Sequence, residues 1–240
     1  MGILRQSAAR AVNLPCGLLG LQVTRRDRLY EALSSYGVNT VLDVGAHTGQ
    51  FALAVRRALP DAMVHSFEPS GETFFELRRS CRADPGIRTW QLALSEEEGV
   101  LSMYRNEASA TSSLLPMTAL SQRAFPHATK WRPEMVTATT LDKWAATQSL
   151  VEPILIKVDV QGYEAQVLRG GMQTFGRALA LLLEVSFAEL YEGQCLFDDI
   201  YALIRGLNFS CCGMFNNIYD PHSHRVLQSD ALFVRSAAPR

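Results

Sequence analysis

Residues 40–51, TVLDVGAHTGQF, decide the fold of this chain. The apolar run that ends near Asp43 predicts a buried strand, and the amphipathic segment that begins at Gly49 predicts a helix. Gly45 in the turn, and Gly49 at the helix start, allow a positive φ and let a ligand approach where a Cβ would intrude. Because open α/β sheets bind ligands at the carboxyl ends of their strands, we expect Asp43 and this turn to face a binding crevice.

Residues 63–70, MVHSFEPS, predict a second strand, which ends at Glu68 before a turn at Pro69. Glu68 follows the glycine turn at close to the ~20-residue spacing at which an acid binds ribose hydroxyls. The turn lacks the GxGxxG spacing that holds a dinucleotide pyrophosphate against a helix. The pattern therefore favours a nucleoside cofactor without phosphates, of which S-adenosylmethionine is the obvious one. A surface acid before a turn proline is the alternative interpretation of Glu68.

Residues 154–171, ILIKVDVQGYEAQVLRGG, predict a buried strand that carries Lys157 and Asp159 on one face. Gln161 and Glu164 follow just beyond its end. Opposite charges in so apolar a strand need each other or a ligand, because burying an unpaired charge costs on the order of several kcal/mol. This tension is typical of active sites, although a purely architectural ion pair is the competing interpretation.

Strand-like and helix-like segments alternate along the chain, which predicts an α/β fold with a doubly wound, mostly parallel sheet. Residues 207–215 and 230–235 are expected to form an antiparallel hairpin that closes this sheet. Prolines at 60, 69 and 85 mark the joints between the first elements. The other strands are predicted at 40–45, 62–68, 87–94, 100–105, 135–138, 153–159 and 178–186, and the helices at 49–59, 71–82, 140–147, 163–175 and 197–206.

Residues 106–133 form a polar insert, rich in Ser and Thr, that is expected to overhang the site. Inserts of this length are usually functional or mobile. His127 and Trp131 are therefore candidate acceptor-binding residues, through hydrogen bonding and stacking, and a mobile lid of no specific role is the alternative. Tyr191 follows the carboxyl end of the strand at 178–186, where it is either a third acceptor contact or a packing residue.

The composition is typical of one α/β domain, with 240 residues, of which 48% are hydrophobic and 20% charged. A net charge of −1 gives no basic footprint for nucleic acid. The chain has 5 cysteines and no CxxC pair, which favours a reducing compartment. No apolar run reaches the length of a membrane span, so we expect a cytoplasmic protein.

Residues 1–35 are expected to form an arm or accessory helix outside the main domain, residues 36–240. The first 28 residues carry five arginines around an apolar stretch at 11–23. Asn13, Pro15, Gly17 and Gly20 interrupt that stretch, which argues against a secretory signal. Packing on the domain is the favoured interpretation, and peripheral contact with an anionic membrane is the alternative.

Taken in order, these motifs and three others resemble the FkbM-type methyltransferases: DVGAHTGQ, FEP, LALS at 92–95, TLD at 140–142, KVDVQGYEAQVLRGG and LLLEVS. The similarity covers about residues 36–235, and the ordered set is more specific than any one motif. It implies a Rossmann-like class I methyltransferase that uses S-adenosylmethionine. It also implies O-methylation of a hydroxyl on a sugar, glycolipid or natural-product acceptor.

The resemblance further implies which residues bind the cofactor. The first turn would wrap the methionine part, the acid after the second strand would hold the ribose, the LALS motif would border the adenine, and Asp159 would lie beside the sulfonium. These residues are Asp43, Gly45, His47, Thr48, Gly49, Glu68, Ala93, Leu94, Ser95 and Asp159. His47 and Thr48 stand where many relatives carry an asparagine and an aliphatic residue, and Gln161 stands where glutamate is frequent, so roles for these three side chains are less secure.

Methyl transfer to oxygen is an in-line displacement, and an alcohol is a weak nucleophile until it loses its proton. Alignment of the reactants supplies about 7–11 kcal/mol and a general base about 10²–10⁴-fold, so positioning should outweigh base strength. Asp159 is the leading base or acceptor-orienting residue. Lys157 would orient it, stabilise a developing alkoxide, or itself take the proton if its pKa is lowered. Glu164 and Glu184 are reserves.

Two other functions stay open. One is a non-catalytic scaffold that binds S-adenosylmethionine, and the other is a nicotinamide-dependent oxidoreductase, which the missing GxGxxG motif disfavours. Asp220, His222 and His224 could bind zinc or iron, but the tip of the terminal hairpin is the simpler interpretation, so no metal site is predicted.

Overall fold

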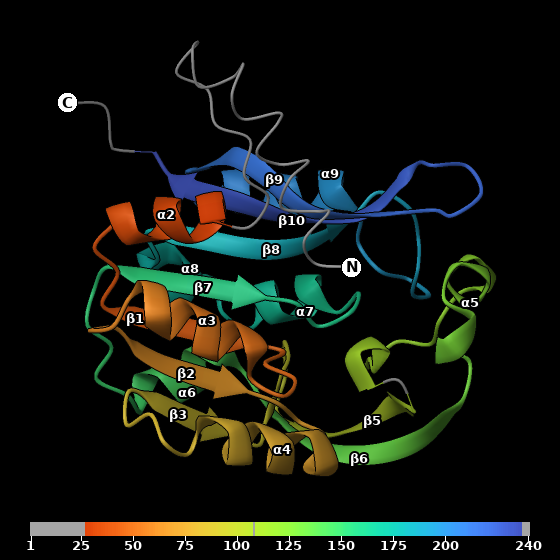
Figure 1. Ribbon diagram of the computed structural model, residues 1–240, viewed down its shortest axis with the longest axis horizontal. Coiled ribbons are helices and arrows are strands. Elements are labelled where there is room, and N and C mark those ends of the chain that lie inside the picture. The colour runs from red at the N-terminus through yellow and green to blue at the C-terminus, as the bar shows by residue number, and fades with distance from the viewer. Residues whose placement is uncertain (1–26, 108, 237–240) are drawn as a thin grey trace, which may run out of the picture.

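A seven-stranded sheet passes through the centre of the protein in the order β3-β2-β1-β7-β8-β10-β9 (Figure 1). The computed structural model describes residues 27–107 and 109–236. Neighbouring strands are parallel except at β10, which runs antiparallel to both β8 and β9. The strands are β1 (Thr40–Val44), β2 (Met63–Phe67), β3 (Ile87–Trp90), β7 (Ile154–Val158), β8 (Ala180–Ser186), β9 (Phe209–Tyr219) and β10 (Val226–Arg235).

This topology confirms the predicted doubly wound sheet with an antiparallel hairpin at one end. The last strand, β10, lies between β8 and β9 instead of at the edge. Every residue of β1 and β7 is buried, because helices cover both faces of the sheet. Burial on both faces explains why these strands are apolar nearly throughout, and why Asp43 and Lys157 stand out in them.

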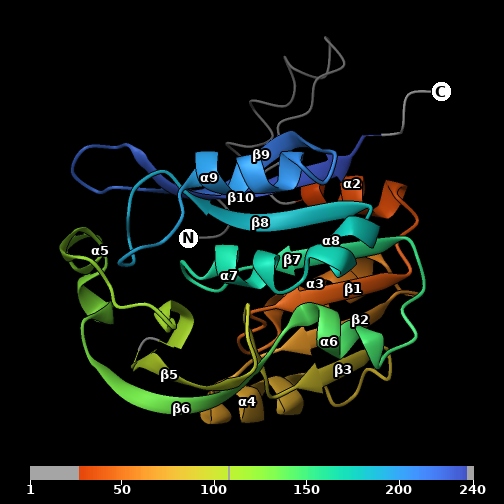
Figure 2. The ribbon, with the colours of Figure 1, turned by 180° about the vertical axis from the view of Figure 1, so that it is seen from behind.

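Two layers of helices enclose the sheet. In Figure 1, α2, α3 and α4 lie in front of it, and Figure 2 shows α6, α7, α8 and α9 on the opposite face. Leu33, Val55 and Leu77 belong to the core of the first layer, and Trp144 and Phe175 to that of the second. The helices are α2 (Asp27–Ser35), α3 (Gln50–Ala58), α4 (Gly71–Cys81), α6 (Leu141–Ala146), α7 (Glu164–Arg169), α8 (Met172–Arg177) and α9 (Phe197–Arg205).

The predicted arm at residues 1–35 is described only in its last helix, α2, and residues 1–26 lie outside the described residues. Leu29 and Leu33 of α2 are buried in the same core as α3. The domain boundary at residue 36 stays a prediction. Within residues 27–107 and 109–236, no helix has both the length and the apolar character that crossing a bilayer requires.

A second sheet, in the order β4-β6-β5, curves away from the main sheet near the carboxyl ends of its strands (Figures 1 and 2). We call this sheet and the short helices between β5 and β6 the arm from here on, as distinct from the N-terminal arm that was expected at residues 1–35. Glu134 of β6 ties it to the start of α4 by accepting hydrogen bonds from Gly71 N at 2.8 Å and Ser70 Oγ at 2.9 Å. Its elements are β4 (Ala93–Leu94), β5 (Gly99–Asn106), η1 (Ser109–Thr111), α5 (Ala119–Ala124), η2 (Pro126–Ala128) and β6 (Trp131–Thr139).

Two predicted elements are each divided in two. The strand expected at 87–94 is β3 and β4, which belong to different sheets because the chain leaves the main sheet after Trp90. The helix expected at 163–175 is α7 and α8, with Gly170 and Gly171 between them. A Cβ on Gly170 would lie 1.9 Å from the carbonyl oxygen of Ser95, so this break lets the chain pass close to the loop after β4.

Candidate functional site

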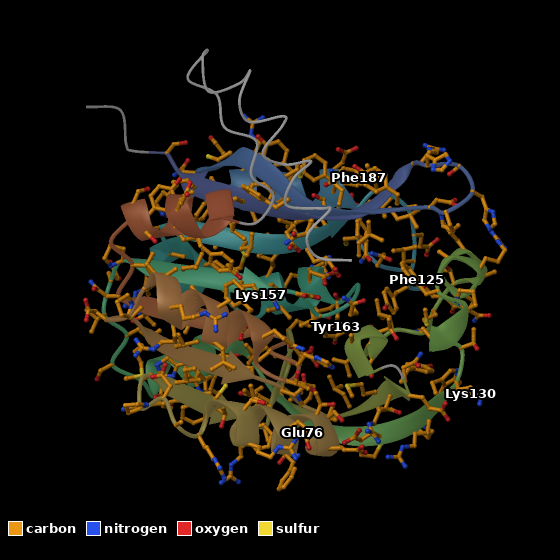
Figure 3. The ribbon with its side chains drawn as sticks, in the orientation of Figure 1. Glu76, Phe125, Lys130, Lys157, Tyr163 and Phe187 are labelled. Atoms are coloured by element: carbon orange, nitrogen blue, oxygen red, sulfur yellow. The ribbon has the colours of Figure 1, made fainter. Side chains whose placement is uncertain are left out.

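A cavity of about 1010 Å³ lies where the carboxyl ends of β1, β2 and β7 face the arm. Its walls come from the turn after β1, the loops after β2 and β7, the arm, and the strands β9 and β10. In Figure 3, Lys157 and Tyr163, which both line it, lie near the centre of the molecule, whereas Glu76 and Lys130 lie at its periphery. The sequence had predicted a crevice at this end of the sheet.

The glycine turn after β1 forms one wall of the cavity. Gly45 has φ of 78°, and a Cβ there would lie 1.8 Å from the carbonyl oxygen of Asp159. Gly45 therefore permits the turn to approach the loop after β7, which closes the floor of the cavity. Gly49 also has a positive φ, of 94°, but a Cβ there would meet Cys81 Sγ at 2.9 Å, so Gly49 is required for packing against α4. His47 lines the cavity, and Thr48 is outside its described lining.

Glu68 lines the same cavity and is held in place by backbone donors. Its Oε2 accepts a hydrogen bond from His47 N at 3.1 Å, and its Oε1 accepts one from Ser70 N at 3.0 Å. The residue is only 8% exposed, which excludes the surface-acid interpretation. Burial raises the pKa of Glu68 to about 7, against the lowering effect of the two backbone donors. Each carboxylate oxygen still has a lone pair for a further donor.

The LALS motif lies beside Glu68. Ala93 and Leu94 line the cavity, while Ser95 is buried and pairs its Oγ with the hydroxyl of Tyr163 at 3.0 Å. Tyr163 itself lines the cavity, so Ser95 contributes to the cavity wall by holding the hydroxyl of Tyr163 in place. Sequence reasoning missed Tyr163, although its position in the turn after β7 was a usable signal.

Lys157 lies between two carboxylates at the floor of the cavity. Its Nζ is 3.2 Å from Asp159 Oδ2 and 3.6 Å from Asp43 Oδ1, and it donates a hydrogen bond to the carbonyl oxygen of Gly45 at 3.1 Å. Asp43 is fully buried below it and also accepts a hydrogen bond from Ser66 Oγ. Burial works to lower the pKa of Lys157, but the charges of Asp159 and Asp43 outweigh burial and raise it. This rise favours the protonated form of Lys157 in the ligand-free protein. Proton uptake by Lys157, which depended on a pKa lowered by a bound sulfonium, stays a prediction.

Gln161 connects Asp159 to a second carboxylate. Its Nε2 donates to Asp159 Oδ1 and to Glu184 Oε2, each at 2.9 Å, and its Oε1 accepts from the hydroxyl of Tyr191 at 2.8 Å. Gln161 has φ of 56°, so its backbone lies in the left-handed region that non-glycine residues seldom adopt. Gln161 stands where glutamate is frequent, and this departure was expected to weaken any role for its side chain. The structure shows that the amide supplies the donors that two neighbouring carboxylates need.

The two reserve acids differ in their surroundings, and neither belongs to the described lining of the cavity. Glu164 Oε1 accepts hydrogen bonds from Val160 N at 3.1 Å and Gly162 N at 3.2 Å, and burial raises the pKa of Glu164 to about 7. Glu184 Oε2 accepts from Gln228 as well as Gln161, and burial raises its pKa well above the ordinary value. Both acids brace the loop that carries Asp159.

Of the predicted acceptor-binding residues, Trp131 and Tyr191 are outside the described lining of the cavity. Trp131 is 54% exposed and packs edge to face on Tyr104, with ring centroids 4.7 Å apart. Tyr191 is buried, and its hydroxyl supports Gln161 from behind. The side chain of His127 lies outside the described residues. The exposed position of Trp131 follows from the curvature of the arm, which turns the start of β6 outward (Figure 1).

The cavity instead includes Asn216 and Asp230 from the two terminal strands, which sequence reasoning did not single out. The hairpin tip with the two histidines lies elsewhere in the sheet. There Asp220 Oδ1 accepts a hydrogen bond from His222 N at 2.8 Å, so this carboxylate closes the turn. Among residues 27–107 and 109–236, no cluster of three or more His, Cys, Asp or Glu side chains has a metal-binding arrangement.

Comparisons with known proteins agree with this geometry. The family described as "Methyltransferase FkbM domain" matches residues 43–211. The chain is 26% identical over 170 residues to the 2-O-methyltransferase NoeI of Sinorhizobium fredii, covering 68% of this chain and 70% of NoeI. It is also 26% identical over 193 residues to the 31-O-demethyl-FK506 methyltransferase FkbM of Streptomyces tacrolimicus, covering 72% and 73% of the two chains.

A solved structure supports the fold. The methyltransferase FkbM from Methylobacillus flagellatus KT superposes with a TM-score of 0.52 at 14% sequence identity, covering 82% of this chain. The present chain spans 44% of that longer protein, so the likeness concerns the fold alone. The family match extends from Asp43, near the end of β1, to Cys211 in β9, and it includes all of β2, β3, β7 and β8. The chain belongs to the FkbM methyltransferase family.

Proposed function

We propose that this protein transfers the methyl group of S-adenosylmethionine to a hydroxyl oxygen of a sugar, glycolipid or natural-product acceptor. One observation carries the proposal: a single cavity contains both Glu68, whose carboxylate is preset by two backbone donors, and Asp159, which is paired with Lys157. The family match supports methyl transfer, and the names of the two relatives support oxygen as the acceptor atom.

The residues around the cavity fit the proposed donor. Glu68 has lone pairs left for the two ribose hydroxyls, and Leu94 and Tyr163 offer apolar and aromatic surface for a purine. The turn at Gly45 gives the close backbone approach that a methionine chain needs. When bound, S-adenosylmethionine supplies an electrophilic methyl group on a positively charged sulfur. Asp159, with 31% of its side chain exposed, is the acid we assign to that end of the cavity.

Asp159 would orient the acceptor hydroxyl and accept its proton. Its Oδ2 is paired with Lys157 and its Oδ1 with Gln161, so the carboxylate cannot rotate freely and its direction is set before any acceptor binds. Lys157 would keep its own proton and stabilise negative charge that develops on oxygen. Alignment of this kind supplies about 7–11 kcal/mol, more than a base of ordinary strength adds. Glu164 and Glu184 would then act through the loop and not on the acceptor.

The test is to incubate the protein with radiolabelled S-adenosylmethionine and fractionated glycans, lipids and small metabolites, and to identify the labelled product. We expect the label on an oxygen. In the same assay Asp159→Asn should lose nearly all turnover, while its affinity for S-adenosylhomocysteine stays within about twofold of the wild type. Full activity in Asp159→Asn would refute the assigned role, and label on nitrogen or carbon would refute the reaction type.

Two controls separate the alternative functions. A scaffold would bind S-adenosylhomocysteine and give no product in any fraction. An oxidoreductase would be stabilised against heat by NAD, because a ligand that binds the native state raises its apparent stability, whereas a methyltransferase should respond to S-adenosylhomocysteine alone. A cytoplasmic location, and a peripheral membrane contact through residues 1–35, stay predictions.

A further inference from the structure

The cavity continues beyond Lys157 toward the terminal strands. There its lining includes Leu182 of β8, Phe215 and Asn216 of β9, and Asp230 of β10. This end is distinct from the end at Glu68 and Leu94, to which we assigned the nucleoside. It is also lined by Phe51 of α3, whose ring lies 5.6 Å from Lys157 Nζ. A polar pair on largely apolar walls is the usual composition of a small-molecule subsite.

Asp230 is the carboxylate of this cavity with the fewest partners. Both oxygens of Asp159 are engaged, one by Lys157 and one by Gln161. Asp230 Oδ2 accepts a hydrogen bond from Asn216 Nδ2 at 2.7 Å, and no described residue donates to its Oδ1. Burial raises the pKa of Asp230, and the nearby charge of Asp159 adds to the rise. A half-buried carboxylate with an unused oxygen is well suited to accept a hydrogen bond from a ligand.

The backbone brings Asn216 to Asp230 at an irregular point of the hairpin. The pairing of β9 with β10 shifts register between Gln228 and Asp230, where β9 has an extra residue. Asn216 has φ of 50°, in the left-handed region, and it lines the cavity, whereas its neighbour Asn217 does not. Asn217 instead accepts a hydrogen bond from Ser229 Oγ at 2.8 Å. Bulges of this kind often redirect a side chain beside a functional site.

We propose that Asp230 and Asn216 bind a second hydroxyl of the acceptor, beside the one that is methylated, so that the acceptor is a neutral diol or polyol. This inference rests on the proposed function and names the part of the acceptor that the enzyme selects. Asp230 would accept the hydrogen bond of that hydroxyl, and the amide oxygen of Asn216 offers a second acceptor. The positive charge of Lys157 is already shared by Asp43 and Asp159. Arg57 of α3 also lines the cavity, so the preference for a neutral group rests on the carboxylate of Asp230, which repels an anion beside it.

The test uses two small probes that differ by one hydroxyl: trans-1,2-cyclohexanediol and cyclohexanol. Their binding to the complex of the full chain with S-adenosylhomocysteine is measured by saturation-transfer NMR. We expect the diol to bind at least about tenfold more tightly than the alcohol, since a hydrogen bond to a charged group is at stake. In Asp230→Asn and in Asn216→Ala this preference should fall to about twofold or less.

The matched control is Asn217→Ala, which removes the same side chain from the adjacent position of the same strand but leaves the cavity lining intact. It should keep the full preference for the diol. Asn216 is exposed at the strand surface, so Asn216→Ala keeps the proposal testable even if Asp230→Asn fails to fold.

The experiment separates failure of the acceptor subsite from failure of the proposed function. If S-adenosylhomocysteine does not bind the wild-type protein in a calorimetric titration, the proposed function itself fails. If it binds, but the diol does not bind, or binds no better than the alcohol, or keeps its advantage in both variants, the acceptor subsite is refuted. A loss of S-adenosylhomocysteine affinity in Asp230→Asn, with diol preference unchanged, would place Asp230 in the donor site and would also overturn the proposal.

Discussion

Glu68→Gln should weaken donor binding and at the same time make the stability of the ligand-free protein less dependent on pH. The wild-type carboxylate is 8% exposed and faces the cavity with two backbone donors bound to it. Glutamine has nearly the same shape but no charge. The substitution therefore removes an ionisable group from a buried site and keeps its volume. The amide nitrogen cannot accept a hydrogen bond, so one of the two backbone donors loses its partner.

The stability change follows from the pKa of Glu68, which burial raises from 4.5 to about 7. The folded protein holds this proton more tightly than the unfolded chain, so the free energy of unfolding falls as the pH rises from about 4.5 to about 7. At 1.36 kcal/mol for each pKa unit, the fall amounts to about 3 kcal/mol. Glu68→Gln removes this pH dependence, while the backbone donor that loses its acceptor costs about 1–3 kcal/mol at every pH. The unfolding free energy of the variant should therefore fall about 3 kcal/mol less between pH 5 and pH 8 than that of the wild type.

The same substitution should lower the affinity for the donor. Two ribose hydroxyls that donate to a carboxylate lose much of that interaction to a neutral amide, and hydrogen bonds to charged groups contribute about 1.5–3 kcal/mol. The affinity for S-adenosylhomocysteine should therefore drop about 10- to 150-fold at pH 8. Wild-type affinity should also fall between pH 8 and pH 6, as Glu68 takes up its proton, while that of the variant stays level.

Urea unfolding at pH 5 and pH 8, followed by tryptophan fluorescence, measures the first effect, and calorimetric titration at pH 6 and pH 8 measures the second. Glu97→Gln makes the same charge change at an exposed position and is the control. Burial also raises the pKa of Glu164 to about 7, so the stability of both proteins changes with pH for this second reason. Only the difference between the variant and the wild type therefore reports on Glu68. A fall in stability between pH 5 and pH 8 that is as large in Glu68→Gln as in the wild type, or an unchanged affinity, would refute the reasoning.

Three further outcomes are expected. Gly45→Ala should lose about 2–4 kcal/mol of stability in urea unfolding, because its Cβ would clash with the Asp159 carbonyl. Gly37→Ala, also at positive φ but with open space around it, should lose only about 1–2 kcal/mol, and equal losses would argue against the clash. Gln161→Leu should reduce turnover at least about tenfold in the labelled-donor assay with S-adenosylhomocysteine binding unchanged, and wild-type turnover would exclude a positioning role. Arg235→Met should unfold about 2–4 kcal/mol more easily, because the guanidinium donates to three backbone carbonyls, and a loss below about 0.5 kcal/mol would contradict that account.

Much of the site could be predicted because parallel strands end at one edge of a sheet. Asp43, Glu68 and Asp159 each stand at or just past the end of an apolar run, and the alternation of strands and helices indicated that those runs are neighbours. The observed order β2-β1-β7 places them together. Local pattern is sufficient here, since each residue's position depends only on where its own strand ends.

The rest depended on contacts between distant parts of the chain. Trp131 was expected near the acceptor, but pairing of β6 with β5 along its length makes it part of the outer arm. Tyr191 was left open between ligand contact and packing, and its hydroxyl bonds Gln161 behind the wall. Neither position can be predicted from the local sequence, because loops and edge strands take their direction from what they pack against.

The sequence by itself determined the α/β sheet, the crevice at the carboxyl ends of its strands and the pairing of Lys157 with Asp159, since these follow from hydrophobic periodicity and strand ends. Only the tertiary structure decided which further groups join them. Asp230 and Asn216 reach the cavity through an antiparallel strand placed between two others and a shift in its register. A one-residue change of register moves a side chain to the opposite face of a sheet, and long-range pairing, not local sequence, sets that register.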